Sequence, residues 1–244
     1  MALMAAAVNF NVRIVSYNMH GFMQGLPVVE DLIASDNKPD VFLLQEHWLT
    51  PANLVKFDNY FPGYFSFGCS AMSNCVQSDM LRGRPSGGVI ILIKNELRSH
   101  VETIYCEERY AVVRVANYFI ANIYLPCSGS PDRLFMCEDI LANVSALYDR
   151  YRACECLIAG DFNVNLDCSD PVAVCINKFL SDCSLYRCDD IFPLQKSMTY
   201  RSEALGHESC IDYVLVSDAQ DVLTFMVDAP DINFSDHLPL KCSY

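Results

Sequence analysis

The apolar run over residues 157–159 stops at Gly160 and is followed at once by Asp161 and Asn163. A short continuous apolar run is typical of a strand buried in an α/β sheet, and ligand sites lie beyond the carboxyl ends of such strands. Residues two apart on an extended segment point to the same side, so Asp161 and Asn163 can address one ligand. By itself the segment favours a plain strand followed by a polar turn, because Gly, Asp and Asn are ordinary turn residues.

Three further apolar runs end in polar clusters of the same kind, which are Gln45-Glu46-His47-Trp48, Ile211-Asp212-Tyr213 and Ser235-Asp236-His237. A joint pattern of four such clusters is much harder to obtain by chance than any one of them. We therefore expect the four strand ends to meet at one polar site.

Hydrophobic periodicity predicts strands and helices in alternation. Helical spacing covers residues 27–37, with Pro27 suited to the first turn, residues 130–152, which follow a start signal at Ser130-Pro131-Asp132, and residues 171–183. Strand patterns cover residues 12–17, 40–46, 64–71, 87–94, 99–106, 110–116, 118–124, 211–217, 222–227 and 238–242. The chain therefore opens as β-α-β, and the turn at Ala116-Asn117 predicts an antiparallel hairpin within a mixed sheet.

The composition is that of a globular protein, with 244 residues, of which 52% are hydrophobic and 19% charged. We expect one soluble domain over residues 1–244, with residues 1–10 as a flexible end. No apolar stretch approaches the roughly 20 residues that cross a bilayer. Residues 1–7 are apolar but too short for a signal peptide and have no basic residue before them, so no targeting signal and no membrane partner are expected.

Thirteen cysteines are scattered along the chain without a CxxC pair. A disulfide framework would show regular spacing in a short secreted chain, so free thiols in an intracellular, reducing compartment are expected here. Cys106 and Cys156 lie in apolar runs and are predicted to be small core residues. Cys154 and Cys156 would share one face of a strand, which leaves a zinc site open, although further ligands are missing.

The net charge of −13 argues against a protein that grips nucleic acid by bulk electrostatics, since such domains are usually basic. A local basic face remains compatible with it. The densest basic spot is Arg82-Gly83-Arg84, in a polar loop over residues 72–86. A solvated loop is its default interpretation, and a phosphate contact follows only if the loop lies beside the site.

Glu46, Asp161, Asp212 and Asp236 are too many acids for one crevice, because like charges repel and raise each other's pKa. A divalent cation resolves this conflict. Magnesium or manganese takes one or two carboxylates and leaves positions for phosphate oxygens, which suits phosphodiester chemistry. A zinc hydrolase would need clustered histidines, and the five histidines show no zinc-binding spacing.

His237 directly follows Asp236, so on an extended segment the two side chains point apart and the histidine needs an acid from elsewhere. Asp212 is the candidate. A carboxylate would fix the imidazole tautomer and raise its pKa, so that His237 could act as a cation on a phosphate or as an acid or base. The alternative for an Asp-His dipeptide alone is a surface pair.

Six ordered motifs resemble the endonuclease/exonuclease/phosphatase superfamily: Ser16-Tyr17-Asn18, Gln45-Glu46, Asn122-Ile123-Tyr124-Leu125-Pro126, Gly160-Asp161-Phe162-Asn163, Ile211-Asp212-Tyr213 and Ser235-Asp236-His237. The resemblance covers almost the whole chain from residue 12. It implies a four-layer α/β sandwich, in which two mixed β-sheets pack face to face between helices. Within the superfamily, the chain looks most like the apurinic-type endonuclease domain of non-LTR (LINE-type) retrotransposons.

The resemblance also implies a role for each matching residue. Asn18, Glu46 and Asp236 match the metal side, Asp161 and Asn163 the pair that holds the attacking water, and Tyr124 a phosphate contact, while Asp212 orients His237. Thr199 and Ser209 match polar residues that flank a DNA-facing hairpin, with its tip at residues 202–208. Arg201, Arg82 and Arg84 would contact flanking phosphates.

His20 departs from the pattern, because cellular abasic-site repair enzymes have an acid at this position. The departure favours the retrotransposon branch and argues against strong abasic-site activity. His20 is expected to be a capped, partly buried histidine, with a phosphate contact on DNA as the alternative.

By resemblance, the activity is magnesium-dependent nicking of one strand of double-stranded DNA. The 3′ hydroxyl would prime reverse transcription by a reverse transcriptase domain of the same polyprotein, in the nucleus. We expect the chain to be a domain cut from that polyprotein and monomeric in isolation. The identity of the general base stays open. The alternatives are a superfamily phosphoesterase on abasic DNA or on inositol or phospholipid phosphates, and a catalytically silent nucleic-acid-binding module.

Overall fold

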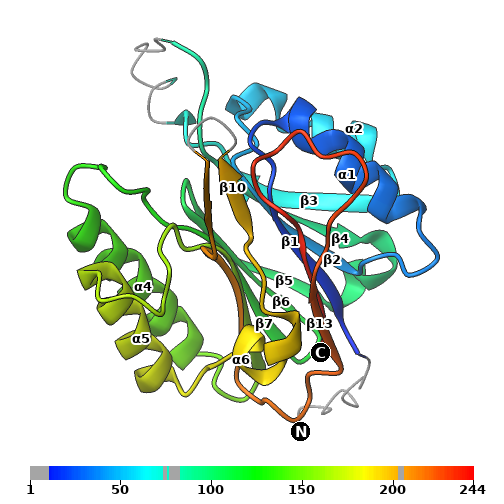
Figure 1. The fold of residues 1–244 in the computed structure, drawn as a ribbon. Helices are drawn as coiled ribbons and strands as arrows, with labels where there is room; N and C mark the ends of the chain where they lie inside the picture. The colour runs from blue at the N-terminus through cyan, green and yellow to red at the C-terminus, as the bar shows by residue number, and fades with distance from the viewer. Residues whose placement is uncertain (1–10, 74–75, 77–82, 203–205) are drawn as a thin grey trace, which may run out of the picture.

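Two six-stranded β-sheets pack face to face in the computed structural model, and helices cover both outer faces (Figure 1). The structure describes residues 11–73, 76, 83–202 and 206–244. The predicted flexible end at residues 1–10, Arg82 and the centre of the predicted hairpin tip lie outside the described residues.

The first sheet contains both chain-terminal strands of the fold. Its order is β13 (Thr224–Val227), β14 (Leu240–Ser243), β1 (Arg13–Asn18), β2 (Val41–Gln45), β4 (Val89–Lys94) and β3 (Tyr64–Cys69). β1 and β2 run parallel, and the other neighbours run antiparallel.

The second sheet is built from the middle of the chain. Its order is β5 (Val101–Glu107), β6 (Tyr110–Val115), β7 (Tyr118–Tyr124), β8 (Glu155–Asp161), β12 (Asp212–Val216) and β9 (Tyr186–Arg187). β7 and β8 run parallel, and β6 and β7 form the predicted antiparallel hairpin. A separate small hairpin consists of β10 (Tyr200–Ser202) and β11 (His207–Ser209).

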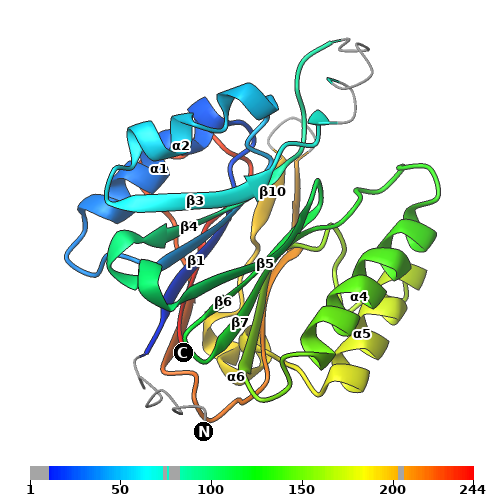
Figure 2. The same ribbon diagram turned by 180° about the vertical axis from the view of Figure 1, so that it is seen from behind.

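Two pairs of helices form the outer layers. The first pair, α1 (Phe22–Ala34) and α2 (Lys56–Tyr60), covers the first sheet, and the second pair, α4 (Arg133–Asp149) and α5 (Pro171–Cys183), covers the second (Figure 2). Short helical turns occupy α6 (Cys188–Ile191), Pro51–Asn53, Asn95–His100 and Pro193–Gln195. In the described part of the chain, no helix is long and apolar enough to cross a membrane.

Each interface between layers has its own hydrophobic cluster. Leu43 of β2 and Leu157 of β8 point between the sheets, whereas Leu44 of β2 points to α1 and Ile158 of β8 points to α4 and α5. Neighbouring residues on each strand therefore serve different layers, which is why buried strands read as continuous apolar runs. The predicted four-layer α/β sandwich with mixed sheets is confirmed.

The strand directions bring the polar ends together at one edge of the sandwich. The parallel pairs β1/β2 and β7/β8 deliver their carboxyl ends there, and β12 begins there with Asp212 directly opposite Asp161. Asn122 fixes the two sheets to each other below this edge, because its Nδ2 donates to the carbonyls of Leu44 and Ile90 at 3.0 Å.

The first helix differs from the prediction of residues 27–37. It begins at Phe22, ends at Ala34 and places Pro27 in its second turn. The chain leaves β1 through Gly21, whose amide donates to Glu46 O at 2.8 Å, while the amide of Phe22 donates to His47 O at 3.0 Å. These hydrogen bonds to the end of β2 begin the helix before Pro27. They offset the loss of the one helical hydrogen bond that Pro27 cannot donate.

The second predicted helix, over residues 130–152, is shorter in the structure, whereas the third matches its prediction. α4 begins at Arg133 because Asp132 has a left-handed φ of 50° and its side chain does not cap the helix. α5 spans the predicted residues, and its first turn is capped by Asp170, which accepts from Val172 N at 2.8 Å.

The prediction that all cysteines are free thiols is wrong for one pair. Cys69 of β3 and Cys106 of β5 form a disulfide with a Cα–Cα distance of 6.1 Å. Cys106 is half-buried on an edge strand and not a core residue. Edge strands of the two sheets meet here, which no local sequence pattern reveals. The ten other described cysteines are free, and no described group of three or more potential metal ligands includes Cys154 or Cys156.

Candidate active site

Asp161 is the last residue of β8 and the centre of the polar edge. Its side chain is almost fully buried and accepts hydrogen bonds from Asn18 Nδ2 at 3.0 Å, Asn163 Nδ2 at 3.0 Å and Asn163 N at 2.8 Å. The apolar run stops at Gly160 because a Cβ there would lie 1.8 Å from Ile123 O of the neighbouring strand. Burial, with help from Asp212, raises the pKa of Asp161, so this carboxylate takes up a proton more readily than a surface aspartate.

Asn163 lies beside Asp161, but through a turn of the backbone and not through the extended segment that the sequence predicts. Its φ of 54° is left-handed, a conformation that asparagine tolerates, so the chain after Asp161 turns and does not stay extended. The turn lets Nδ2 of Asn163 donate to Asp161 and to Leu125 O at 2.9 Å. Among the described residues, none donates to its Oδ1, which stays available as an acceptor.

His237 lies between two aspartates. Its Nδ1 is 2.9 Å from Asp212 Oδ2, and its Nε2 is 3.9 Å from Asp161 Oδ2. Burial lowers the pKa of the imidazole, but the carboxylates, Asp212 foremost, outweigh burial and raise it to about 10. The ring is therefore in the imidazolium form at neutral pH, with a proton on each nitrogen. Its Nδ1 is held by Asp212, and its Nε2 is directed toward Asp161.

Thr199 holds the far side of Asp212. Its Oγ1 donates to Asp212 Oδ2 at 2.7 Å and accepts from the amides of Ile211 at 3.0 Å and Asp212 at 3.1 Å. Thr199 is only 1% exposed, and its hydroxyl is engaged by these three groups. The DNA contact predicted for this residue stays a prediction. Thr199 directly precedes β10, and its amide donates to Ser209 O of β11 at 3.0 Å, so the base of the hairpin places the hydroxyl where it holds the aspartate.

Glu46 and Asn18 form the other side of the site. Glu46, at the end of β2, accepts from Asn18 Nδ2 at 3.1 Å and from Trp48 Nε1 at 2.9 Å. The amide of His20 donates to Asn18 Oδ1 at 3.0 Å, which fixes the side-chain amide with its NH₂ group toward the carboxylates. In this arrangement Asn18 holds Glu46 and Asp161 side by side as a donor, and its oxygen faces away from them.

Asp236 and His20 complete this side. His20 Nδ1 lies 3.0 Å from Asp236 Oδ1, and its ring packs on Trp48 with centroids 4.8 Å apart. The Asp236 carboxylate, in this hydrogen bond, raises the pKa of His20. His20 is thus partly buried and held by Asp236, and its predicted phosphate contact stays a prediction. His47, in contrast, is fully buried, and burial lowers its pKa to about 4, so it is a neutral structural residue.

The donor set fits a hard divalent cation. Asp161, Asp212 and His237 bring potential ligand atoms within 4.8 Å of one another among the described residues. Asp212 lies at Nδ1 of His237, whereas Asp161 and Asp236 each lie 3.9 Å from Nε2 on the other side of the ring, and Asn18 joins Asp161 to Glu46. A cation on that side would use the carboxylates of Glu46, Asp161 and Asp236, and such oxygen ligands suit magnesium or manganese.

Tyr124 ends β7 beside these acids. Burial, followed by the charges of Glu46 and Asp161, raises the pKa of its hydroxyl far above the ordinary value. A phenol that stays protonated can donate to a phosphate oxygen.

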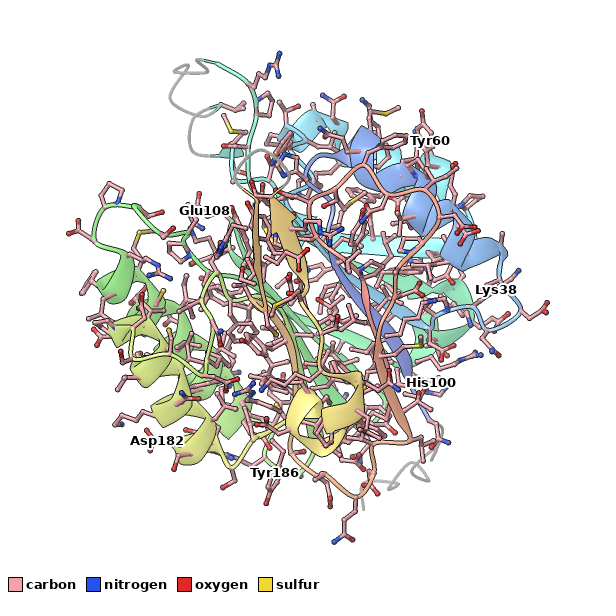
Figure 3. The ribbon with its side chains drawn as sticks, in the orientation of Figure 1. Lys38, Tyr60, His100, Glu108, Asp182 and Tyr186 are labelled. Carbon is pink, nitrogen blue, oxygen red and sulfur yellow. A yellow bond between two sulfur atoms is a disulfide. The ribbon has the colours of Figure 1, made fainter. Side chains whose placement is uncertain are left out.

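Arg109 is a site residue that sequence reasoning missed. Among the described residues nothing accepts a hydrogen bond from its buried Nε and Nη1 atoms. Its guanidinium lies 5.2 Å from the centroid of the Tyr124 ring, in a cavity of about 170 Å³ that Glu46 and Gly87 also line. The neighbouring Glu108 marks this end of the sandwich, near the small hairpin (Figure 3). Buried guanidinium donors without a partner require an acceptor such as a phosphate oxygen.

The other described residues that were predicted to contact DNA lie around the outside of the polar edge. Arg201 of β10 is exposed and forms an ion pair with Glu208 of β11, and Ser209 is half-buried at the base of the hairpin. Arg84 is exposed, and its loop returns to the site where Ser86 and Gly87 line the Arg109 cavity. A larger cavity of about 730 Å³ opens between the hairpin and the segment before His237, and its lining includes Tyr200, Arg201, Asn233, Phe234 and Asp236.

Known structures share the fold of this chain. The AP endonuclease LMAP from Leishmania major has a TM-score of 0.76 at 15% identity, covering 96% of this chain and 87% of that one. The 3′ phosphatase NExo from Neisseria, solved with a product DNA hairpin, has a TM-score of 0.71 at 20% identity, covering 95% and 98%. An AP endonuclease from Archaeoglobus fulgidus has a TM-score of 0.68 at 17% identity, also covering 95% and 98%. These likenesses show the fold.

No curated protein matches the sequence at a significant level. A family model, in contrast, matches residues 15–237, which include every polar cluster of the edge described above. The chain belongs to the Endonuclease/Exonuclease/phosphatase family.

Proposed function

We propose that this chain is a magnesium-dependent DNA endonuclease that nicks one strand and leaves a 3′ hydroxyl. The observation that carries the proposal is the buried arrangement in which Asp212 holds His237 and His237 faces Asp161 across 3.9 Å. A protonated imidazole beside a carboxylate of raised pKa pairs a cation for the phosphate with a base for the water.

The proposed chemistry uses the donor and acceptor groups that lie at the polar edge. Asp161 and Oδ1 of Asn163 hold a water that attacks phosphorus, and Asp161 accepts its proton. His237 Nε2, Tyr124 and Arg109 bind the non-bridging oxygens as charge develops on them. The bond from phosphorus to the 3′ oxygen breaks, the phosphate stays on the 5′ side of the nick, and the 3′ oxygen takes a proton from solvent water and leaves as a hydroxyl. Magnesium on the carboxylate side would neutralise charge on the phosphate and the leaving oxygen.

Three observations support DNA as the substrate. The hairpin β10–β11 lies beside the site, because Tyr200 of β10 forms a β-bridge with His237. Two donors of Arg109 have no partner among the described residues. Two similar structures are AP endonucleases, and a third was solved with a DNA hairpin. His20, where repair enzymes have an acid, favours the endonuclease domain of a non-LTR retrotransposon. We therefore propose target-primed reverse transcription as the process, a reverse transcriptase domain of the same polyprotein as partner and the nucleus as location.

A nicking assay on supercoiled plasmid with Mg²⁺ tests the proposal. Asp161→Ala and His237→Ala should each lower nicking by at least about 100-fold, the scale for losing a positioned acid, base or electrostatic group. Asp182→Ala and His100→Ala are the matched controls, since both residues are exposed and lie away from the polar edge (Figure 3). Circular dichroism checks that each variant is folded.

Parallel assays on an abasic duplex and on inositol phosphates separate the alternatives. Preferred cleavage at the abasic site would assign the chain to repair, and phosphate release from inositol phosphates would assign it to the phosphatases. Near-normal nicking by a folded Asp161→Ala or His237→Ala variant would refute the site assignment.

A further inference from the structure

Arg133 contacts the turn that carries Asn163, although it lies on a helix outside the polar edge. It is the first residue of α4, and its side chain is only 15% exposed. Its Nη2 donates to Asn163 O at 2.8 Å, and its Nε donates to Pro126 O at 3.2 Å. Its Nη1 donates to Asp170 Oδ2 at 3.1 Å. One guanidinium therefore joins three separate segments of the chain.

The position of this arginine is unfavourable for the helix itself. Partial positive charge gathers at a helix N-terminus, so a cation in the first turn opposes the helix dipole. The first turn of α4 holds no acidic residue that would compensate. The three acceptors, not helix stability, account for an arginine at this place.

Two of the acceptors belong to the loops that carry site residues. Pro126 lies two residues beyond Tyr124, and Asn163 carries the free Oδ1 beside Asp161. The same loops are also joined directly, because Asn163 Nδ2 donates to Leu125 O at 2.9 Å. Asn163 holds a left-handed φ of 54°, so its turn needs an external restraint to keep the amide in place.

We propose that Arg133 is a positioning residue that fixes Asn163, and through it the attacking water, relative to Tyr124. The inference rests on the proposed nuclease function for its catalytic consequence. Its structural content, that the guanidinium holds the Asn163 turn, stands independently of that function.

Arg133→Lys is the test variant because lysine keeps the charge but cannot reproduce the planar fork that reaches three acceptors. We expect kcat for plasmid nicking to fall about 10-fold, as for other residues that orient a catalytic group. The KM for DNA should stay within about two-fold, since the Arg133 guanidinium is engaged by three acceptors within the chain. Guanidinium ion added to Arg133→Ala should restore part of kcat.

Arg152→Lys is the matched control. Arg152 also joins α4 to α5, through Cys183 O at 3.2 Å and Asp149 at 3.0 Å, but at the opposite end of the helix pair. This variant should change neither kcat nor KM. If both variants lower kcat equally with equal losses of thermal stability, Arg133 acts only on the helices and the proposal is wrong.

Nuclear magnetic resonance of the free protein separates this inference from the nuclease function. The backbone and side-chain amide signals of Asn163 should shift in Arg133→Lys and stay unchanged in Arg152→Lys. Unchanged Asn163 signals in Arg133→Lys would overturn the positioning role, even with an active enzyme. Shifted signals in a protein that cleaves no DNA would keep the restraint and refute the proposed function alone.

Discussion

At the scale of single residues, Thr199 shows how a buried hydroxyl supports the site. Its hydroxyl donates to one carboxylate oxygen and accepts from two backbone amides, all within 3.1 Å. Thr199→Val keeps the shape but leaves these groups unsatisfied, at a cost of about 1–3 kcal/mol. We expect a lower free energy of unfolding by that amount in urea denaturation, and slower nicking because Asp212 loses its restraint. Thr199→Ser keeps the hydroxyl and should resemble the wild type; identical behaviour of the two variants would contradict the role.

Residues that end strands could be predicted from the sequence, whereas residues that act from other elements could not. Asp161 and Glu46 follow apolar runs, so the break in hydrophobicity marks them. Arg109 directly precedes β6 and Arg133 begins α4, and neither position follows an apolar run that would mark it in the sequence. Their importance depends on acceptors that the fold brings from distant segments, or on the lack of any acceptor. The family resemblance pointed to Thr199, but only the structure shows that this residue is buried.

At the scale of elements, the Cys69–Cys106 disulfide joins the edge strands β3 and β5, where the sequence predicts free thiols. Thiol titration under denaturing, non-reducing conditions measures this pairing. Of the thirteen cysteines, the two in the Cys69–Cys106 disulfide should not react, so the count should be near eleven. Full reduction should restore thirteen. A count of thirteen before reduction would contradict the pairing.

The element boundaries were predictable where local signals act alone and less so where tertiary bonds decide. α5 begins at a proline after a capping aspartate, both visible in the sequence. α1 begins earlier than its apolar pattern suggests, because amides at its start bond to the end of β2. The strand segments were recognisable, but their division between two sheets depends on pairing over long sequence distances.

At the scale of the whole molecule, the net charge of −13 limits how DNA can be held. Few cations lie at the polar edge, and the small hairpin offers little chemistry for reading base edges. We therefore expect selection by DNA shape, with preferred nicks at deformable pyrimidine-purine steps such as TA and modest discrimination. Replacing the residues between β10 and β11 with a Gly-Ser turn should flatten this preference. Cut sites mapped on a long duplex decide the matter; one sharply defined sequence, or an unchanged pattern, would place specificity elsewhere.

The end chemistry of the product tests the central claim most directly. A duplex labelled on one strand is incubated with the protein and Mg²⁺, and a DNA polymerase is then added without phosphatase treatment. The account predicts a nick in one strand whose 3′ end the polymerase extends, no cleavage in EDTA, and cleavage lowered at least about 100-fold in His237→Ala. A 3′ end that cannot be extended, or cleavage that persists in EDTA or in a folded His237→Ala variant, would contradict it.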